Sequence, residues 1–384
     1  MSARPPNPSG PLKVAYLVTR GDDIGGVQVH VRDLAAAMRA AGHAATVICG
    51  PPGIFTEELA ERGIPFRCLP HLVRPVDPLR DPMALVELRG ALRELQPDLI
   101  AMHSCKTRML GCLAARATRS ATVSTVHGWL LADGVPMGKR RFYGFCERQA
   151  ARLTTAIVTV SHYDKELAVR HRIVAPERVT VVHNGMPDEA PRRDHDQSAG
   201  PVRLLMVGRH SPQKDHETLF RALALLRDKS WTLDLLGTGP DEPRHQALAR
   251  EYGLIDRVHF LGYRKDVSTL MATADIYVLI SNWEGLPLSI IEAMRAGLAT
   301  VCSDVGGCRE LVVEGDTGCL AKRGDAAAVA RHLGMLIDSP DQRRRLGKTA
   351  RLRFEQDFTF AAMFDRTVSV YHGVLTGRQV PSRQ

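Results

Sequence analysis

The sequence lacks several features that would place it in a familiar class of protein. Its 384 residues contain no apolar run near the roughly 20 residues that a membrane-spanning helix needs. The first residues, MSARPPNPSG, are polar and rich in proline, without the apolar core of a signal peptide. The eight cysteines include no Cys-x-x-Cys pair, so neither a disulfide framework nor a zinc site is indicated. We therefore expect a cytoplasmic protein with reduced thiols.

The charge of the chain is unbalanced toward the positive. Lysine and arginine number 51 against 42 aspartate and glutamate, a formal net charge of +9. A basic balance attracts phosphate-bearing partners of any kind, including nucleic acid, anionic lipid and nucleotides. The sequence has no zinc-finger spacing, RNP-like string or basic low-complexity arm, so charge alone supports nucleic-acid binding. We expect no nucleic-acid partner.

Short β-branched runs alternate with helix-length periodic stretches from end to end. This alternation is typical of parallel sheets with crossover helices and predicts an α/β fold. The strands expected in the first half lie at residues 13–19, 46–49, 99–103, 121–126, 156–160 and 179–183. Those expected in the second half lie at residues 203–207, 233–236, 259–261, 276–280 and 300–303.

One charged segment rich in proline and glycine, MPDEAPRRDHDQSAG over residues 186–200, separates the two halves. It lacks hydrophobic periodicity, which favours a linker. We predict a tail over residues 1–10, an N-terminal domain over 11–188, a linker over 189–200 and a C-terminal domain over 201–359. Two open α/β domains joined in this way form a cleft between the carboxyl edges of their sheets, where such sheets bind ligands.

Two cations follow the strand predicted to end at Val207. Arg209 carries a planar fork of donors and Lys214 a compact charge, within the turn GRHSPQKD. Such a pair suits a diphosphate whose negative charge grows as it leaves. Either cation alone is more simply explained as a solvated loop charge.

A second element, EGLPLSIIEAM, follows the strand predicted at residues 276–280. Pro287 is placed to open a helix and Gly297 to close it, and the free amides at the helix start can bind a phosphate. Glu284 lies in the preceding loop and Glu292 one turn into the helix. This spacing can send one carboxylate toward sugar hydroxyls and the other toward a ribose diol. Either glutamate alone would be read as a capping or an exposed acid.

The first half contributes a glycine pair and a histidine. Gly25 and Gly26 open the helix after the first strand, and paired glycines let a ligand approach the backbone closely. The string is neither G-x-G-x-x-G nor a Walker A loop, which argues against NAD or ATP binding. His127 follows the strand over 121–126 at its carboxyl end. Read alone, the glycines predict a tight turn and the histidine a structural role.

The stretch after His127 combines apolar and basic residues. The apolar ones are Trp129, Leu130, Leu131, Val135 and Met137, and the basic ones are Lys139, Arg140, Arg141, Arg148 and Arg152. An exposed apolar loop beside a basic helix can rest on an anionic membrane surface. A core-facing loop and a solvated helix explain the same residues.

The string SNWEGLPLSIIEAMRAGLATVCSDVGGCRELV, from Ser281 to Val312, resembles the E-x7-E signature of the retaining GT-B glycosyltransferases of family 4, or group 1. VGRHSPQKDHETL, LLGTGP, HFLGYRKDV and EGDTGCLA stand in the order of that family. The resemblance covers nearly the whole chain and is strongest from Arg203 to Ala321. It implies two Rossmann-like domains facing across a cleft, no essential metal or cofactor, and a C-terminal helix near 360–378 that packs back on the first domain.

The resemblance also implies a role for each candidate residue. Arg209 and Lys214 would hold the donor diphosphate, Glu284 would contact the transferred sugar, and Glu292 would bind the ribose. His127 would face the donor sugar in the transition state. The other residues implied at the donor are Gly237, Gly285, Leu286, Leu288 and Ser289, and Gly25 and Gly26 would lie near phosphate and acceptor.

Two residues depart from the family pattern. Asp215 stands where the family often has glycine, and its charge beside Lys214 is expected to weaken the grip on phosphate. Ala299 stands where the family often has proline. Neither departure removes a donor contact.

The implied activity is transfer of a hexose-type sugar from a UDP- or GDP-sugar to a glycan or lipid-linked acceptor. Its setting would be cell-surface polysaccharide biosynthesis, with possible peripheral contact to the inner face of the membrane. A non-hydrolysing nucleotide-sugar epimerase would share the architecture and the donor site but would need no acceptor surface. A nucleic-acid binder would explain only the charge.

Overall fold

The computed structural model describes residues 10–129, 131, 137–189, 191 and 200–377, and the chain divides into two compact units. The chain passes from the first unit to the second between His183 and Asn184, and back between Met363 and Phe364. Residues 192–199 of the predicted linker and most of the predicted tail lie outside the described residues.

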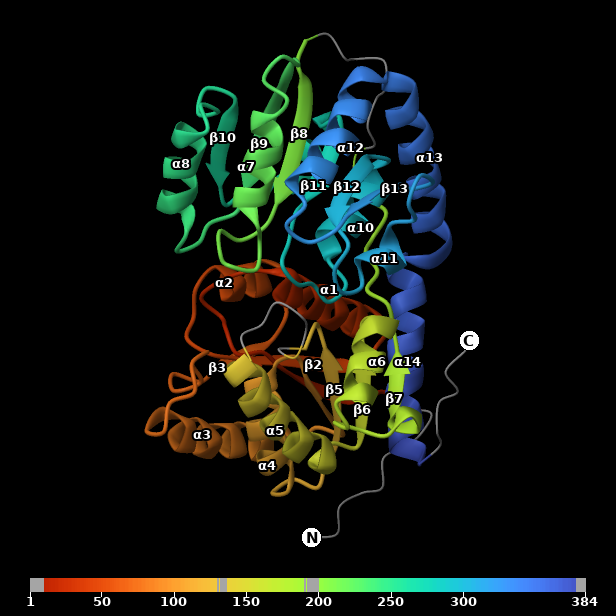
Figure 1. Cartoon of the computed structure of the whole chain (residues 1–384). Helices are drawn as coiled ribbons and strands as arrows, with labels where there is room; N and C mark the ends of the chain where they lie inside the picture. The colour runs from red at the N-terminus through yellow and green to blue at the C-terminus, as the bar shows by residue number, and fades with distance from the viewer. Residues whose placement is uncertain (1–9, 130, 132–136, 190, 192–199, 378–384) are drawn as a thin grey trace. The chain divides into compact units, whose positions relative to one another are not determined.

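The first unit is built around one parallel sheet with strand order β3-β2-β1-β4-β5-β6-β7 (Figure 1). Neighbouring strands pair in parallel register, as when Val14 lies opposite both Ala45 and Leu99. The strands are β1 (Lys13–Leu17), β2 (Ala44–Cys49), β3 (Phe66–Cys68), β4 (Leu99–Met102), β5 (Ala121–Val126), β6 (Ala156–Thr159) and β7 (Val179–Val181).

Crossover helices connect these strands, because successive parallel strands need a long return connection. They are α1 (Gly26–Ala40), α2 (Ile54–Glu61), α3 (Arg80–Leu95), α4 (Cys105–Ala115), α5 (Met137–Leu153) and α6 (His162–Arg170). Helix α3 packs on α4, and α4 packs on α5. The C-terminal helix α14 (Phe360–Thr376) begins in the second unit, and its residues from Phe364 onward belong to the first.

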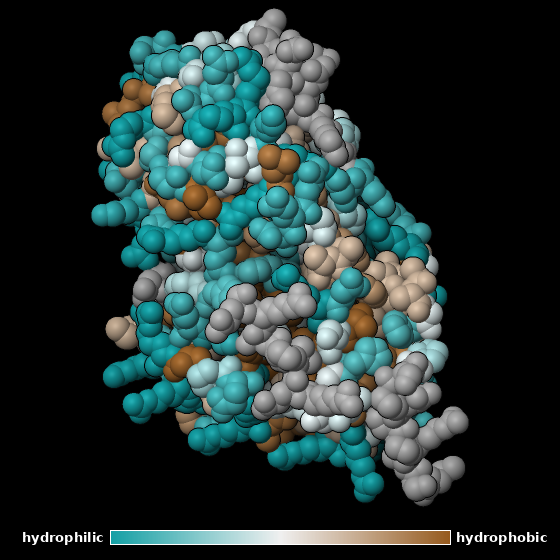
Figure 2. Space-filling view, turned by 90° about the vertical axis from the view of Figure 1, so that its right-hand side faces the viewer, coloured by the Kyte–Doolittle hydropathy of each residue, from teal (hydrophilic) through white to brown (hydrophobic). Residues whose placement is uncertain are grey.

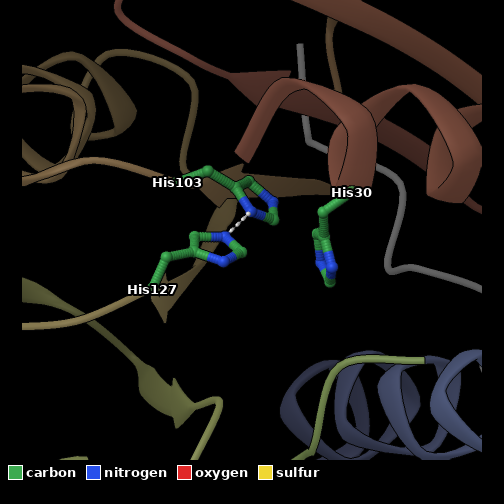
Figure 3. A group of neighbouring side chains, drawn as sticks. All are labelled: His30, His103 and His127. Carbon is green, nitrogen blue, oxygen red and sulfur yellow. Dashed lines mark hydrogen bonds between the residues drawn. The ribbon is translucent and has the colours of Figure 1, made fainter. Parts of the chain in front are cut away.

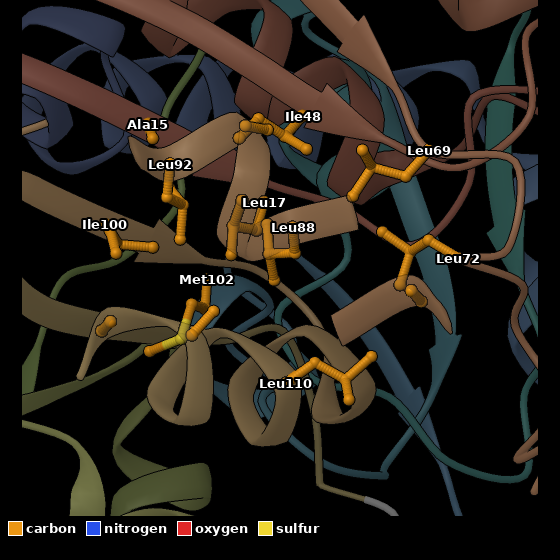
Figure 4. Close-up of a cluster of buried hydrophobic side chains, with 14 of the residues drawn as sticks. Ala15, Leu17, Ile48, Leu69, Leu72, Leu88, Leu92, Ile100, Met102 and Leu110 are labelled. Carbon is orange, nitrogen blue, oxygen red and sulfur yellow. The ribbon is translucent and has the colours of Figure 1, made fainter. Parts of the chain in front are cut away.

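Aliphatic side chains of the sheet and of α3 and α4 form a buried cluster (Figure 4). Leu17, Ile100 and Met102 come from β1 and β4, and Leu88 and Leu92 from α3. The strands read as near-continuous apolar runs because helices cover both faces of a parallel sheet. This core packs against β1 and β4, and His103 directly follows β4.

The second unit repeats the architecture, with strand order β10-β9-β8-β11-β12-β13 and all pairs parallel. Its strands are β8 (Val202–Val207), β9 (Trp231–Leu236), β10 (Val258–Gly262), β11 (Ile276–Leu279), β12 (Ala299–Ser303) and β13 (Gly318–Ala321). Its helices are α7 (His216–Ala224), α8 (Glu242–Glu251), α9 (Val267–Thr273), α10 (Leu288–Ala296), α11 (Cys308–Leu311), α12 (Ala326–Asp338) and α13 (Pro340–Asp357).

The α/β fold with two Rossmann-like domains is confirmed, but two strands escaped the sequence analysis. Strand β3 has three residues and lies at a sheet edge, and β13 lies at the edge of the other sheet within a glycine-containing turn region.

All eight cysteines are free, and five of them are buried. No described helix is long and apolar enough to cross a bilayer. The face drawn in Figure 2 is mostly hydrophilic, with apolar residues in small groups.

Candidate active site

Four candidate residues of the second unit follow two neighbouring strands: Arg209 and Lys214 come after β8, and Glu284 and Glu292 come after β11. These strands pair in parallel, and the strand order reverses between them. In an open α/β sheet such a reversal leaves a crevice at the carboxyl ends of the two strands, where ligands bind. The sheet topology therefore gathers the loop after β8 and the loop after β11 at one place.

Backbone hydrogen bonds join these two loops directly. The amide of Asp215 donates to the carbonyl of Ile280 at 2.9 Å, and the amide of Asn282 donates to the carbonyl of Gln213 at 2.8 Å. Lys214 and Ser281 form an antiparallel bridge between the two bonds. The backbone of Lys214 is thus held by hydrogen bonds between the loops after β8 and β11.

The side chains of Lys214 and Glu284 form a buried ion pair. The Lys214 ammonium contacts Glu284 Oε1, and their side chains are 11% and 6% exposed. The other carboxylate oxygen of Glu284 accepts from Gln213 Nε2 at 3.1 Å. Two charges this far from water are stable when each is paired and hydrogen-bonded. The remaining ammonium protons of Lys214 are available for a second anion.

Asp215 does not compete for Lys214, contrary to the expectation from the sequence. Its side chain caps α7, where Oδ1 accepts from the Thr218 amide at 3.1 Å and Oδ2 from the Thr218 hydroxyl at 2.7 Å. A carboxylate at a helix N-terminus is stabilised by the helix dipole. The carboxylate of Asp215 therefore stabilises the N-terminus of α7.

Helix α10 begins and ends where the sequence predicted. Pro287 is its N-cap, and Gly297 closes it with a left-handed φ of 77°. Glu292 is half-buried on the first turns of this helix. Leu288 and Ser289 are also half-buried at its start, whereas Leu286 is buried and its carbonyl accepts from Asn184 Nδ2 at 2.8 Å. The helix start thus presents backbone, a hydroxyl and one carboxylate within two turns.

A tyrosine that the sequence analysis missed lies among these groups. Tyr277 of β11 is buried, and its hydroxyl donates to the carbonyl of Val207 at 3.4 Å. Burial raises the pKa of Tyr277 well above its usual value, and the charges of Glu292 and Glu284 raise it further. A tyrosine in an apolar strand gives no signal beyond β propensity, so only the fold reveals that its hydroxyl interacts with both glutamates.

Two glycines are required by close backbone approach around the site. Gly237, which follows β9, has a φ of 126°, and a Cβ there would collide with the carbonyl of Gly208. Gly306 has a φ of 57°, and a Cβ there would collide with the carbonyl of Glu284. The amide of Gly307 also donates to the carbonyl of Gly285 at 2.8 Å. These contacts hold the backbone on either side of Lys214 and Glu284.

Arg209 is exposed on the loop after β8, and three buried histidines lie beside it. His210 and His245 are linked through their Nδ1 atoms at 2.9 Å, and the rings of His216 and His245 stack at 4.1 Å. Burial lowers the pKa of His245 to about 4, with the charge of His210 adding to the effect. These imidazoles are therefore neutral at pH 7 and add no charge to the loop.

The candidate residues of the first unit gather at a different sheet edge. Gly25 is the N-cap of α1 and Gly26 its first residue, as the sequence predicted. His127 follows β5 and is half-buried, with its Nε2 3.0 Å from Nδ1 of His103 at the end of β4. His30 of α1 completes a group of three rings (Figure 3). Burial lowers the pKa of His127 well below its usual value, so the ring is neutral at pH 7.

The apolar loop after His127 is only partly as expected. Trp129 and Leu131 are each 2% exposed. The indole of Trp129 donates to the carbonyl of Asp164 at 2.8 Å. Leu130 and Val135 lie outside the described residues. The exposed apolar residues are instead on α5, where Met137, Phe142 and Phe145 are 66%, 53% and 57% exposed. The basic residues Arg141 and Arg152 of α5 are also exposed.

Sequence families match both halves of the chain. Residues 188–353 match the family described as "Glycosyl transferases group 1", and residues 24–190 match "Glycosyltransferase Family 4". One relative is the UDP-Gal:alpha-D-GlcNAc-diphosphoundecaprenol alpha-1,3-galactosyltransferase of Escherichia coli, 27% identical over 85% of this chain and 88% of the relative. Another is the glycogen synthase of Mycobacterium tuberculosis, 27% identical over 93% of each chain.

Solved structures share the fold. HepE from Anabaena in complex with UDP-glucose superposes with a TM-score of 0.81 at 23% identity, over 94% of this chain and 99% of that one. The sucrose-phosphate synthase of Thermosynechococcus elongatus gives a TM-score of 0.83 at 21% identity, over 95% and 100%. At such identities the likeness establishes the arrangement of helices and strands, which is that of GT-B glycosyltransferases.

Proposed function

The chain belongs to the group 1, or family 4, glycosyltransferases, and from that premise we propose that it moves a hexose-type sugar from a UDP-sugar to a glycan or lipid-linked acceptor with retention at the anomeric carbon. The observation that carries this proposal is the buried contact of Lys214 with Glu284 at the ends of two adjacent strands. In this proposal Lys214 binds the diphosphate and Glu284 beside it binds sugar hydroxyls, at a point where the strand order reverses.

In this proposal the protein offsets the charge of the leaving diphosphate with its own groups. Lys214 and Arg209 lie on the loop after β8, and the first amides of α10 lie after the neighbouring strand β11. Cations and helix amides fixed before the reaction stabilise charge as it develops, because they need not reorganise. We accordingly expect transfer to proceed without a divalent ion on the diphosphate.

The two glutamates receive different tasks. Glu284 pairs with Lys214 and accepts from Gln213, and we assign its carboxylate to the sugar beside the diphosphate. Glu292 lies one turn into α10, where a carboxylate can accept from both hydroxyls of a ribose. His127, a neutral imidazole, serves as a hydrogen-bonding contact to the sugar and not as a cation.

The relatives favour UDP among the possible nucleotides. The name of the Escherichia coli relative specifies UDP-Gal and a lipid diphosphate acceptor, and HepE was solved with UDP-glucose. GDP remains the alternative nucleotide. By the same reasoning we place the protein in cell-surface glycan assembly at the cytoplasmic face of a membrane.

An acceptor assay separates this function from that of a non-hydrolysing epimerase. We expect label from a UDP-sugar to enter a lipid or glycan fraction only when an acceptor extract is added, with release of UDP in equal amount. Conversion of the UDP-sugar into an isomeric UDP-sugar in the absence of any acceptor would identify the epimerase instead.

The exposed face of α5 is the surface we assign to membrane contact. Phe142, Phe145 and Met137 project from a helix that also exposes Arg141 and Arg152. Apolar and basic side chains on one helix surface bind anionic bilayers through burial and charge together. The opposite side of α5 is anchored, because Glu147 pairs with the buried Arg108 of α4.

Replacing Phe142 and Phe145 with serine is expected to weaken binding to anionic vesicles by about tenfold or more, since each phenyl ring buried contributes roughly 1.5 to 3 kcal/mol. Co-sedimentation with vesicles containing phosphatidylglycerol measures the change. The matched control replaces Leu225 and Leu352, which are 63% and 48% exposed in the second unit. Equal loss in both double variants, or no loss in either, would show that α5 is not the membrane-binding surface.

A further inference from the structure

Three histidines from three separate elements meet at the carboxyl edge of the first sheet. His30 comes from α1, His103 follows β4 and His127 follows β5 (Figure 3). The ring centroid of His30 lies 5.5 Å from that of His103 and 4.8 Å from that of His127. The centroids of His103 and His127 are 5.3 Å apart. Each ring is thus about equally far from the other two.

The buried nitrogens of this group are not all satisfied. His30 and His103 are 6% and 2% exposed, yet His30 Nδ1 and His103 Nε2 have no hydrogen-bond partner among the described residues. A buried polar atom left unpaired costs about 1 to 3 kcal/mol, so such atoms usually have a ligand, an ion or water. Two unpaired nitrogens in one cluster indicate a bound group that interacts with imidazole nitrogen, such as a metal ion that accepts its lone pair.

The spacing of the rings fits a tetrahedral cation. A zinc ion binds imidazole nitrogen at about 2.0 to 2.1 Å, which places two such nitrogens about 3.3 Å apart and the ring centroids about 5 Å apart. One potential ligand nitrogen from each of the three rings lies within 4.8 Å of the others, and a hydrogen bond of 3.0 Å between His103 Nδ1 and His127 Nε2 holds two of the rings together. Shifts of the rings by about an ångström would complete the arrangement.

We propose that His30, His103 and His127 bind a divalent cation of the zinc class, with a fourth position open to water or to an oxygen of a ligand. Three neutral imidazoles and an open position are the donor set of catalytic zinc sites, and nitrogen donors select zinc, cobalt, nickel or copper over magnesium and calcium.

This site is distinct from the diphosphate site of the second unit. An ion bound here occupies the His127 ring that the proposed function assigns to the sugar, and on that assignment zinc is expected to inhibit transfer. Binding itself does not depend on the proposed function, because it is measured without any sugar or nucleotide. A failed inhibition test would therefore count against the role of His127, and a failed binding test against the metal site.

A chelator competition assay with Zn²⁺ on the full-length, metal-free protein tests the proposal. We expect His30→Gln and His103→Gln each to bind one equivalent less than the unmodified protein at the same free zinc concentration, or to bind that equivalent at least tenfold more weakly. His71→Gln is the matched control, because His71 lies in the same unit and pairs with Glu87 on the surface. With Co²⁺ in place of Zn²⁺, the same equivalent should give the visible absorption of a tetrahedral site.

The second buried cluster, His210 with His216 and His245, supplies a further discriminating variant. If His245→Gln removes the zinc equivalent while His30→Gln and His103→Gln keep it, the site lies there and the proposal is wrong. It is also wrong if the unmodified protein binds no zinc. An unchanged unfolding midpoint of the metal-free His30→Gln and His103→Gln proteins shows that a variant without zinc is still folded in the first unit, which contains both residues.

Discussion

Replacing Lys214 with alanine is expected to lower kcat/KM for sugar transfer by about 10- to 150-fold, the equivalent of about 1.5 to 3 kcal/mol for a charge-assisted hydrogen bond. Lys214 is 11% exposed, and two backbone hydrogen bonds between the loops after β8 and β11 flank it. Its loss also leaves the Glu284 carboxylate without its cation, close to where the phosphate would bind.

Three comparisons make this prediction specific. Lys229→Ala is the matched control, since Lys229 pairs with Asp338 on the surface, and its activity should stay within twofold of the unmodified protein. Lys214→Arg should recover part of the loss because it keeps the charge. Glu284→Gln combined with Lys214→Ala should cost less than the sum of the two single changes, because contacting residues are not additive. Unchanged turnover of the Lys214→Ala variant would show that Lys214 does not bind the donor diphosphate.

Replacing Glu147 with alanine is expected to destabilise the first unit by about 3 to 5 kcal/mol. Arg108 and Glu147 are 2% and 3% exposed and form an ion pair between α4 and α5. Arg108 Nε also donates to Ser124 at 2.5 Å, and its guanidinium lies 5.0 Å from the centre of the Trp129 ring. Removing the carboxylate leaves a guanidinium buried without its countercharge, which is why the cost exceeds that of a surface pair.

Urea denaturation followed by tryptophan fluorescence measures this effect as a lowered midpoint. The matched control is Glu94→Ala, which breaks the exposed pair with Arg67 and should cost less than about 1 kcal/mol. Arg108→Met combined with Glu147→Leu should be less destabilising than Glu147→Ala, because no unpaired charge remains. If Glu94→Ala and Glu147→Ala lowered the midpoint equally, the buried pair would not hold α5.

The strand positions were predictable because each parallel strand is a short apolar run bounded by polar turns. The prediction for β5 at 121–126 coincides with the observed strand. The helix after Glu284 was equally predictable, since Pro287 and Gly297 mark its two ends chemically. Short edge strands such as β3 lack an apolar run long enough to recognise, because one side of an edge strand has no neighbour to pair with.

Contacts between distant segments could not be predicted from the sequence. The spacing of Glu284 and Glu292 indicated two carboxylates, but not that Glu284 would pair with Lys214, because that contact depends on which strands are neighbours. The cap that Asp215 forms on α7 is local, and its signal is an aspartate directly before an amphipathic helix. The histidine group is a similar case, since His30, His103 and His127 are far apart in sequence and come together only through the order of β1, β4 and β5.

Thermal unfolding with added nucleotide shows whether the second unit binds a nucleotide diphosphate through Lys214 and Glu292. A nucleotide at 100 times its Kd stabilises a folded protein by about 2.7 kcal/mol. We expect UDP to raise the unfolding temperature more than GDP or ADP does. Glu292→Ala should reduce this shift, whereas Glu251→Ala, on the exposed end of α8, should not. The absence of a shift with all three nucleotides would show that the second unit does not bind a nucleotide diphosphate.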